Sequence, residues 1–486
     1  MELVYASTRD AQERVTASQA ILRGLANDGG LFVPTQIPAL DVPMEELGKM
    51  SYQETAYEVM KRFLTDFTEE ELKHCINSAY DSKFDTEEIA PLAKADGMYF
   101  LELFHGKTIA FKDMALQMLP HLLTASLKKC GEQRGVCILV ATSGDTGKAA
   151  LEGFADVRGT KILVFYPRDG VSDVQRLQMV TQTGENVGVC AVEGNFDDAQ
   201  TGVKRIFGDR ELAERLSAKG WFLSSANSIN WGRLLPQIVY YFSAYCDFVN
   251  SGRIKCGERV NFCVPTGNFG NILAAYYARE MGVPIDRLIC ASNSNNVLTD
   301  FIRTGRYDRN RAFHNTISPS MDILISSNLE RLLLALTQDD EQVKDYMAQL
   351  SATGTYQVSD RVREKLQKRF AGYFCDDAET KAVIGRIYQK YDYLIDPHTA
   401  VAFRVAETRR TDAPMVVLST ASPFKFPRDV LTALGGEAPA SDFAAMAALT
   451  AETGAEAPAS LRELDKLEVR FKTVLQPADI RTAALR

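Results

Sequence analysis

The chain has 486 residues, about three times the length of an ordinary domain, and its formal net charge is −8 at pH 7. Acidic and basic residues are interspersed without a basic stripe, which argues against nucleic acid as a partner. Its apolar and charged fractions, 46% and 24%, are typical of a soluble globular protein, and no run approaches the roughly 18 apolar residues of a membrane span.

The cysteines and histidines bear on the compartment and on metal binding. None of the nine cysteines forms a Cys-x-x-Cys pair, and the start of the chain lacks a signal-peptide pattern. We therefore expect reduced thiols in a cytoplasmic protein. The five histidines form neither His-x-x-x-His nor His-Glu-x-x-His, so no metal site is expected. Monomer and homodimer both remain open, because amphipathic helices alone do not reveal a dimer face.

Residues 1–95 are expected to form a separate N-terminal domain. The stretch 24–34 is dense in glycine, asparagine and aspartate, which predicts sharp turns. Charged segments with a helical period follow, such as 68–74.

The pattern changes at residue 96, where short apolar runs begin to alternate with amphipathic stretches. Strands are expected at 136–141, 161–166, 187–192, 221–224, 260–264, 287–291 and 415–418, and helices at 145–156, 172–183, 197–208, 230–248 and 270–281. Continuous apolar strands separated by helices predict a doubly wound α/β fold with parallel sheets, here over 96–299. Ligands of such folds bind beyond the carboxyl ends of the strands.

Three further segments complete the chain. Residues 300–395 are charged and helix-periodic with little strand signal, so we expect a helical insert or lid. Residues 396–435 are expected to return to the core, beginning with a helix that Asp396 caps and Pro397 opens. Residues 436–486 are Ala-rich and predict a helical tail with a flexible connection.

Three loops follow predicted strands, at 141–147, 264–271 and 418–423. Each is rich in small residues and hydroxyls, and the first two lead into helices, whose unpaired N–H groups bind phosphate or carboxylate. Either loop alone is equally well read as a simple strand-to-helix turn; together they favour two anionic ligands or one ligand with two anionic ends. Neither matches the nucleoside triphosphate or dinucleotide glycine motifs.

Lys112 lies in an apolar segment, between Phe111 and Met114. Loss of hydration would lower the pKa of its amine and make it a nucleophile or base, as a Schiff-base lysine requires. The alternative is a lysine whose stem packs on apolar residues while its amine reaches solvent.

Six segments in order resemble one family, threonine synthase, a fold-type-II pyridoxal-phosphate enzyme with a tryptophan synthase β-like architecture. The resemblance covers about residues 5–430, and its segments are 7–9 with 29–34, 105–113, 141–147, 225–233, 265–271 and 419–426.

The resemblance implies conversion of O-phospho-L-homoserine and water into L-threonine and phosphate, with pyridoxal 5′-phosphate as cofactor. Lys112 is then the Schiff-base lysine and proton shuttle, and Thr420 the partner of the pyridine nitrogen. The implied cofactor-phosphate group is Gly267, Asn268, Phe269, Gly270 and Asn271, and the implied substrate-carboxylate group is Thr142, Ser143, Gly144, Asp145 and Thr146.

Ser228, Asn230 and Arg233 are candidates for the substrate phosphate, although a structural salt bridge explains Arg233 almost as well. His398 fits a buried position in a first helical turn and is assigned no role.

The chain departs from the family at two positions. Lys107 stands where the family usually has proline, and Ser422 stands where it usually has histidine. These changes keep two alternatives open: a threonine-synthase-like phospho-lyase that releases 2-oxobutyrate, and a non-catalytic protein that binds pyridoxal phosphate. A serine or threonine dehydratase is disfavoured by the long N-terminal region and the 300–395 segment.

Overall fold

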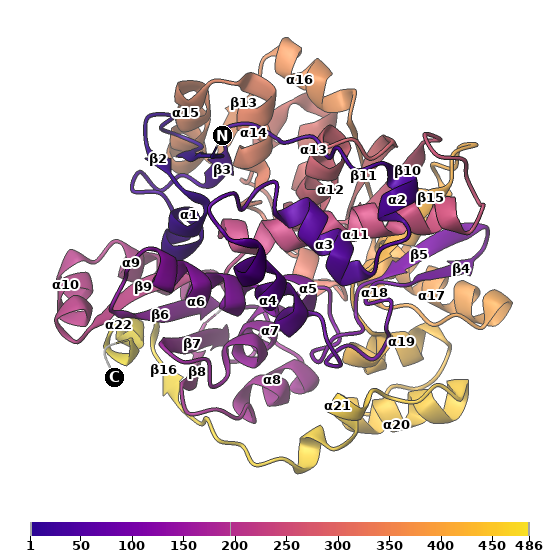
Figure 1. Cartoon of the computed structure of the whole chain (residues 1–486). Helices are drawn as coiled ribbons and strands as arrows, with labels where there is room; N and C mark the ends of the chain where they lie inside the picture. Colours follow the sequence, from indigo (N-terminus) through magenta and orange to yellow (C-terminus); the bar gives the residue numbers. More distant parts are fainter. Residues whose placement is uncertain (1, 195, 485–486) are drawn as a thin grey trace.

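The computed structural model describes residues 2–194 and 196–484 and contains two large sheets with helices on their faces (Figure 1). The five-stranded sheet has the order β16 (Val474–Leu475), β8 (Val187–Val192), β7 (Thr160–Pro167), β6 (Gly135–Ala141) and β9 (Trp221–Ser225). The six-stranded sheet has the order β14 (Phe370–Phe374), β11 (Ile285–Ser292), β10 (Val260–Pro265), β15 (Met415–Ser419), β5 (Met98–Glu102) and β4 (Leu92–Ala95).

Both sheets are parallel, except that β4 pairs antiparallel with β5. The central strands are buried along nearly their whole length, as expected when helices cover both faces of a parallel sheet. The predicted α/β fold is therefore confirmed, and each expected strand occurs within two residues of its predicted bounds.

The helices of the core are α5 (Asp113–Leu116), α6 (Leu119–Lys129), α7 (Asp145–Phe154), α8 (Asp173–Val180), α9 (Phe196–Phe207), α10 (Arg210–Ala218), α11 (Trp231–Asn250), α12 (Gly270–Glu280) and α13 (Val297–Thr304). Five of them, α7, α8, α9, α11 and α12, were predicted, and α5, α6, α10 and α13 were not. The largely buried α11 crosses the centre of the molecule and packs against α12 (Figure 1).

The N-terminal region packs on this core. It consists of a small antiparallel sheet, β2 (Arg14–Val15), β1 (Tyr5–Ser7) and β3 (Phe32–Pro34), and the helices α1 (Ala17–Arg23), α2 (Met44–Leu47), α3 (Tyr52–Met60) and α4 (Glu69–Ala79). Capping boxes at Thr16, Ser51 and Thr68 start α1, α3 and α4. Helix α3 rests on α11, and α1 on α6, so this region shares the main hydrophobic core.

The expected boundaries at 95/96 and 299/300 differ from the observed architecture. The first falls inside the β4–β5 hairpin, and the expected 96–299 core contributes strands to both large sheets. The expectation of little strand in 300–395 is wrong, because β14 is the edge strand of the six-stranded sheet and β12 (Arg306–Asp308) pairs with β13 (Thr355–Gln357). These strands have only three to five residues with partly exposed positions, so they leave no long apolar run.

The remaining helices of this segment are α14 (Leu329–Thr337), α15 (Asp340–Thr353), α16 (Asp360–Gln367) and α17 (Asp377–Tyr391). Helices α14–α16 form the upper part of the molecule in Figure 1, while α17 packs beside α18 (Pro397–Glu407). Helix α18 starts as predicted, because the Asp396 side chain accepts from the amides of His398 and Thr399.

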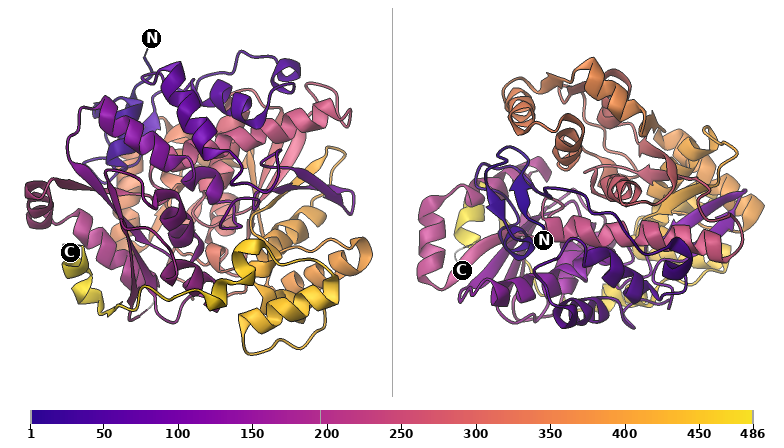
Figure 2. Two further views of the ribbon diagram at one scale, coloured as in Figure 1. Left: turned by 60° about the horizontal axis from the view of Figure 1, so that its bottom comes forward. Right: turned by 45° about the horizontal axis from the view of Figure 1, so that its top comes forward.

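The C-terminal segment runs along the outside of the molecule (Figure 2). After α19 (Pro427–Ala433), α20 (Asp442–Thr453) and α21 (Ala459–Arg462), the chain adds β16 to the edge of the five-stranded sheet and ends the described part with α22 (Ile480–Ala483). The helical tail expected over 436–486 needs correction, because it also contains the strand β16, which is too short to leave a strand pattern in the sequence. Residues 485 and 486 lie outside the described part.

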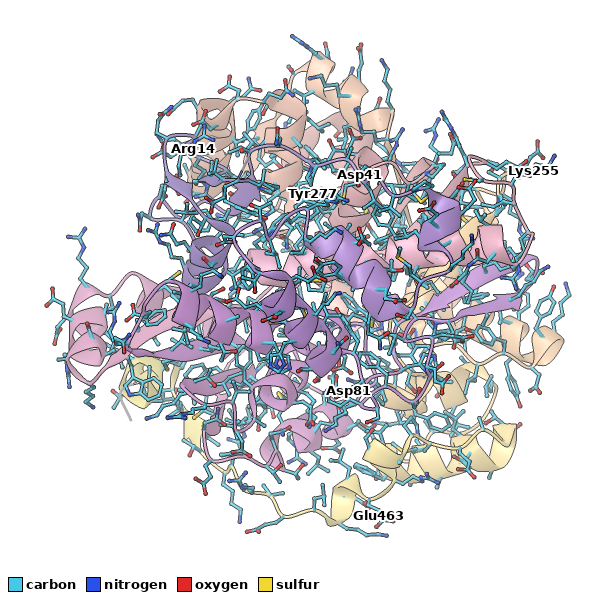
Figure 3. All side chains as sticks on the ribbon, viewed as in Figure 1. Arg14, Asp41, Asp81, Lys255, Tyr277 and Glu463 are labelled. Atoms are coloured by element: carbon cyan, nitrogen blue, oxygen red, sulfur yellow. The ribbon has the colours of Figure 1, made fainter. Side chains whose placement is uncertain are left out.

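Charged side chains of both signs lie around the periphery of the molecule, as Lys255 and Glu463 show in Figure 3. Among the described helices, none combines the length and the apolar character needed to cross a membrane.

Candidate active site

Lys112 lies immediately before α5, in a segment that pairs with the loop after β15. Phe111 N donates to the Thr420 carbonyl at 2.8 Å, and Ser422 N donates to the Ile109 carbonyl at 3.1 Å. The predicted lysine segment and the predicted 418–423 loop are thus joined through their backbones, and Thr420, whose carbonyl accepts from the residue before Lys112, is buried.

One residue of the lysine segment and one of the predicted 264–271 loop have left-handed backbone conformations. Ile109 has a φ of 53° and Phe269, at the start of α12, has a φ of 63°. Such a conformation is unusual for any side-chain-bearing residue, and most of all for a β-branched one. Strain of this kind persists only where the surroundings enforce it, and it clusters at functional sites.

The Lys112 side chain is only 11% exposed, and its amine has defined neighbours. The Nζ atom lies 3.6 Å from Asp145 Oδ2 and 3.4 Å from Ser320 Oγ. Burial lowers the pKa of Lys112; Asp145 opposes this shift, and the positive charges of Lys425 and Arg233 add to it. The amine is therefore easier to deprotonate than that of an exposed lysine.

Asp145 forms a closer ion pair with Lys425 than with Lys112. Lys425 Nζ lies 2.7 Å from Asp145 Oδ1, and the two side chains are 0% and 3% exposed. Burial alone would raise the pKa of Asp145, but Lys425 and Lys112 lower it well below its ordinary value. Gln175 Nε2 also donates to Oδ1, at 2.9 Å. Asp145 thus stays ionised and links the 141–147 loop to the two lysines.

The rest of the 141–147 loop presents backbone amides. Thr142 Oγ1 accepts from Gly144 N and Gly147 N, both at 2.9 Å, which fixes the turn. Within the described chain, the amides of Ser143, Asp145 and Thr146 donate to no other protein group. The start of α7 therefore offers N–H groups to an anionic ligand.

The carbonyls of the glycine-rich loop are held by the segment before α14. Ser326 Oγ donates to the Gly267 carbonyl at 2.8 Å, and Asn328 donates to the Asn268 carbonyl from its backbone N and from Nδ2, both at 3.1 Å. In a trans peptide the following N–H points opposite to the carbonyl. The amides of Asn268 and Phe269 therefore point away from that segment and stay available, ahead of Gly270 at the start of α12.

Asn271 lies in the first turn of α12. Its Oδ1 accepts from the hydroxyls of Tyr240 and Tyr241 at 2.6 and 2.7 Å. Its Nδ2 is buried and makes no hydrogen bond within the described chain. A buried amide donor in this state is available to a ligand, and pairing it would recover the free energy that an unpaired polar group costs.

The three candidates for a second anion lie in different environments. Arg233 is buried and forms no ion pair in the described chain; its Nη1 donates to the Ala226 carbonyl at 2.6 Å, and its Nε makes no hydrogen bond there. Burial lowers the pKa of Arg233 to about 10. The salt-bridge alternative is thus absent, and an anionic partner would balance this charge.

Asn230 differs from Arg233, because its side chain is fully used by the fold. It caps α11 by accepting from Gly232 N at 2.9 Å and donates to the carbonyls of Ile21 and Ser225, both at 3.0 Å. We therefore assign Asn230 a structural role. Ser228 Oγ remains near the site, 3.2 Å from Ser327 Oγ.

Both residues at which the chain departs from the family pattern make contacts within the protein. Lys107 Nζ forms an ion pair with Glu152 Oε1 at 3.2 Å, which ties the Lys112 segment to α7. Ser422 Oγ accepts from Phe424 N at 3.4 Å and starts a 3-10 turn.

Two residues of the site were not singled out from the sequence. Lys425 lies in the quoted 419–426 segment, and its position between Phe424 and Phe426 was an available signal of burial. Ser320 lies in the 300–395 segment and had no signal, because its place depends on tertiary packing.

The chain matches three family profiles along its length. Residues 4–80 match "Threonine synthase N terminus", residues 85–420 match "Pyridoxal-phosphate dependent enzyme", and residues 399–483 match "Threonine synthase, C-terminal".

Several individual proteins are also similar. "Threonine synthase-like 1" of Macaca fascicularis is 44% identical over 88% of this chain, and the chain spans only 59% of that protein's length. Threonine synthase of Pseudomonas aeruginosa is 42% identical over 90% of this chain and 91% of the relative. The crystal structure of threonine synthase from Brucella melitensis, bound to pyridoxal phosphate, has 37% sequence identity and a TM-score of 0.87, with 99% of both chains covered. The yeast threonine synthase structure has a TM-score of 0.87 and 34% identity, with 99% and 97% covered.

The predicted fold and the order of the motifs thus agree with the profiles and with the structural matches, and the chain belongs to the threonine synthase family of pyridoxal-phosphate-dependent enzymes.

Proposed function

We propose that this protein is a threonine synthase, a lyase that converts O-phospho-L-homoserine and water into L-threonine and phosphate. One observation carries the proposal: the amine of Lys112 is buried, has a lowered pKa, and lies beside the ion pair of Asp145 and Lys425. This arrangement, in a member of the threonine synthase family, is what a covalent cofactor anchor that also moves protons requires.

The site fits pyridoxal phosphate in two respects. The cofactor is an anionic aldehyde, so it needs both an amine that can be neutral and a pocket of N–H donors. Lys112 supplies the amine. The residues Gly267, Asn268, Phe269, Gly270 and Asn271 supply the donors, and the buried Nδ2 of Asn271 is one that the protein itself leaves unpaired.

When bound, pyridoxal phosphate supplies an electron sink for the carbons next to the substrate amine. Lys112 would remove and return protons at the substrate Cα and Cβ, which lets phosphate leave from Cγ and water add at Cβ. Thr420 would hydrogen-bond the pyridine nitrogen, and a hydroxyl there does not hold that nitrogen protonated. The amides of Ser143, Asp145 and Thr146 would bind the substrate carboxylate.

Arg233 would bind the substrate phosphate, because its buried guanidinium lacks an anionic partner in the described chain and is suited to bidentate contact with phosphate. Ser228 is the second proposed contact. We further propose a cytoplasmic setting, since all nine cysteines are free thiols, as a reducing compartment favours.

Product identification tests the reaction. Purified protein supplied with O-phospho-L-homoserine should release threonine and phosphate in equal amounts. 2-Oxobutyrate as the main product would support the phospho-lyase alternative, which the change at Ser422 and the similarity to "Threonine synthase-like 1" keep relevant.

Trapping tests the anchor separately. Reduction of the cofactor-loaded protein with borohydride, followed by peptide mapping, should place the cofactor on Lys112, and Lys112→Ala should abolish the adduct and the turnover. Lys128→Ala, at an exposed position near the end of α6, is the matched control and should retain both. An adduct elsewhere in the wild type would contradict the assignment.

A further inference from the structure

A short turn of the 300–395 segment brings a hydroxyl to the amine of Lys112. This turn, Pro319–Met321, carries Ser320, whose Oγ lies 3.4 Å from Lys112 Nζ and 3.4 Å from Asp145 Oδ2. A protonated amine can only donate and an ionised carboxylate can only accept. The Ser320 hydroxyl therefore accepts from Lys112 and donates to Asp145, so its orientation is fixed.

The backbone of Ser320 is held by a buried histidine. Ser320 N donates to His398 Nε2 at 3.2 Å, and His398 Nδ1 lies 2.6 Å from Asp396 Oδ2. Because Nε2 accepts, the neutral ring carries its proton on Nδ1 and donates it to Asp396. Asp396 is itself fully buried and anchored by the first amides of α18. The first turn of α18 thus sets the position of Ser320.

The same turn is held from two other directions. Asp322 accepts from Thr316 N at 3.0 Å and from Nδ2 of Asn293 and Asn295 at 2.7 and 2.9 Å, which ties the turn to the end of β11. On its other side the turn lies directly on Gly267, where an added Cβ would approach the Ser320 carbonyl to 2.7 Å. Neither contact involves Lys112, so the turn is positioned independently of the amine that it meets.

A directional partner matters for this lysine. Its side chain has four rotatable bonds, and ordering them carries an entropy cost. The attraction to Asp145, at 3.6 Å, depends little on direction. A hydroxyl with fixed orientation defines where the amine points when it is free to exchange protons, and proton transfer depends on that geometry.

We propose that Ser320 is a further catalytic residue of this site, which orients the free amine of Lys112 through its hydroxyl, and that His398 is a positioning residue that acts through Ser320. This inference deepens the proposed function and rests on it, since Lys112 is the same residue that is proposed to move protons.

The first test measures the amine itself in the full-length chain freed of cofactor. The rate of reductive methylation of Lys112 with formaldehyde, followed by mass spectrometry as a function of pH, reports the pKa of its amine. Ser320→Ala should lower this pKa further, because the charged amine loses an acceptor. Ser320→Thr keeps the hydroxyl at a partly exposed position and should restore the wild-type value.

The second test measures turnover of O-phospho-L-homoserine. Ser320→Ala should lower kcat about tenfold with little change in KM, the factor that a hydrogen bond of ordinary strength gives. His398→Ala should also lower both the pKa of Lys112 and kcat. His398→Gln, which keeps an acceptor near the Nε2 position, should retain most of the wild-type kcat. His314→Ala, an exposed histidine of the same segment, is the matched control and should behave as wild type.

Different results would refute the proposed function and the role of Ser320. If borohydride traps no cofactor on Lys112 of the wild type, the proposed function fails whatever Ser320 does. If the wild type is trapped on Lys112 and turns over, while Ser320→Ala shows the wild-type methylation profile and kcat, the role of Ser320 is overturned. A Ser320→Thr variant as defective as Ser320→Ala would also overturn it, because the hydroxyl would then not be the operative group.

Discussion

Lys425 and Lys112 pair with different oxygens of the Asp145 carboxylate: Lys425 Nζ is 2.7 Å from Oδ1, and Lys112 Nζ is 3.6 Å from Oδ2. The nearer and fully buried Lys425 compensates most of the negative charge of Asp145. Lys112 is therefore able to lose its proton without leaving a carboxylate unpaired in the protein interior.

The Lys425→Met variant should raise the pKa of Lys112. Lys112 would lose a repelling positive charge and become the sole cationic partner of Asp145, so its protonated form would be favoured. Turnover near pH 7 should fall, and the fall should be partly reversed at higher pH. Methylation of Lys112 against pH measures the shift. Lys128→Met is the control, and an unchanged or lowered pKa in Lys425→Met would refute this account.

Gly267→Ala should destabilise the protein and displace the Ser320 turn. The new Cβ would lie 2.7 Å from the Ser320 carbonyl oxygen and 3.3 Å from Met321 Cα, and backbone atoms have little freedom to move. Crowding of this kind costs about 1–3 kcal/mol. Thermal unfolding and cofactor affinity would both report it. Gly208→Ala, where the nearest atom would be 3.7 Å away, should unfold like the wild type; equal losses in the two variants would point to a general effect of alanine.

Glu152→Gln should remove part of the acid sensitivity of the fold. Burial acts to raise the pKa of Glu152, but Lys148 and Lys107 lower it from 4.5 to about 2. Since the folded state favours the ionised form, its contribution is complete above about pH 4.5 and is lost as the pH falls toward 2.

The variant should thus be less stable than wild type at pH 7, by roughly 2 kcal/mol because Lys107 is half-exposed, and this difference should shrink between pH 4.5 and 2. Denaturant unfolding at several pH values measures it. A difference that is constant with pH would exclude the ion pairs as its cause.

Arg331→Met should loosen the glycine-rich loop. The buried guanidinium of Arg331 donates to the carbonyls of Phe32 and Ile229 at 3.1 and 2.6 Å and also to Asn328 Oδ1, while Asn328 holds the Asn268 carbonyl. Acceptors left unpaired would cost about 2 kcal/mol or more.

Lower stability and weaker binding of pyridoxal phosphate are the expected results, measured by thermal unfolding and by cofactor titration. Arg361→Met, at an exposed position on α16, serves as the control. Full cofactor affinity in Arg331→Met would show that Asn328 holds the loop without it.

Much of the fold was predictable because buried parallel strands appear as uninterrupted apolar runs. Strands β6, β7, β8 and β10 were located to within a residue for this reason. Strand β14 was missed, since a five-residue edge strand with partly exposed positions has no such run. The sequence also does not show that β6 and β10 belong to different sheets, because pairing partners depend on contacts between distant segments.

The site was predictable where its residues follow strand ends or a family motif. Lys112 and the 141–147 and 264–271 loops fall into this class. Ser320 does not, because a serine in an irregular segment acquires its place through tertiary contacts. Its backbone is held by His398, 78 residues later in the chain, and its turn lies on Gly267. Asn230 shows the converse, since its motif position suggested a ligand contact while its amide is occupied by the backbone.

The strand β16 fastens the end of the chain to the five-stranded sheet, whereas the helix α19, earlier in the same C-terminal segment, comes soon after β15 of the six-stranded sheet. Arg470 Nη1 and Arg481 Nε add anchors, at 2.6 Å to the Gln182 carbonyl and 2.5 Å to Asp209 Oδ2. The segment between α20 and β16 therefore connects the part of the molecule built on the six-stranded sheet to the part built on the five-stranded sheet. One proteolytic cut in this segment would separate the anchored end of the chain from α20 without touching a residue of the site.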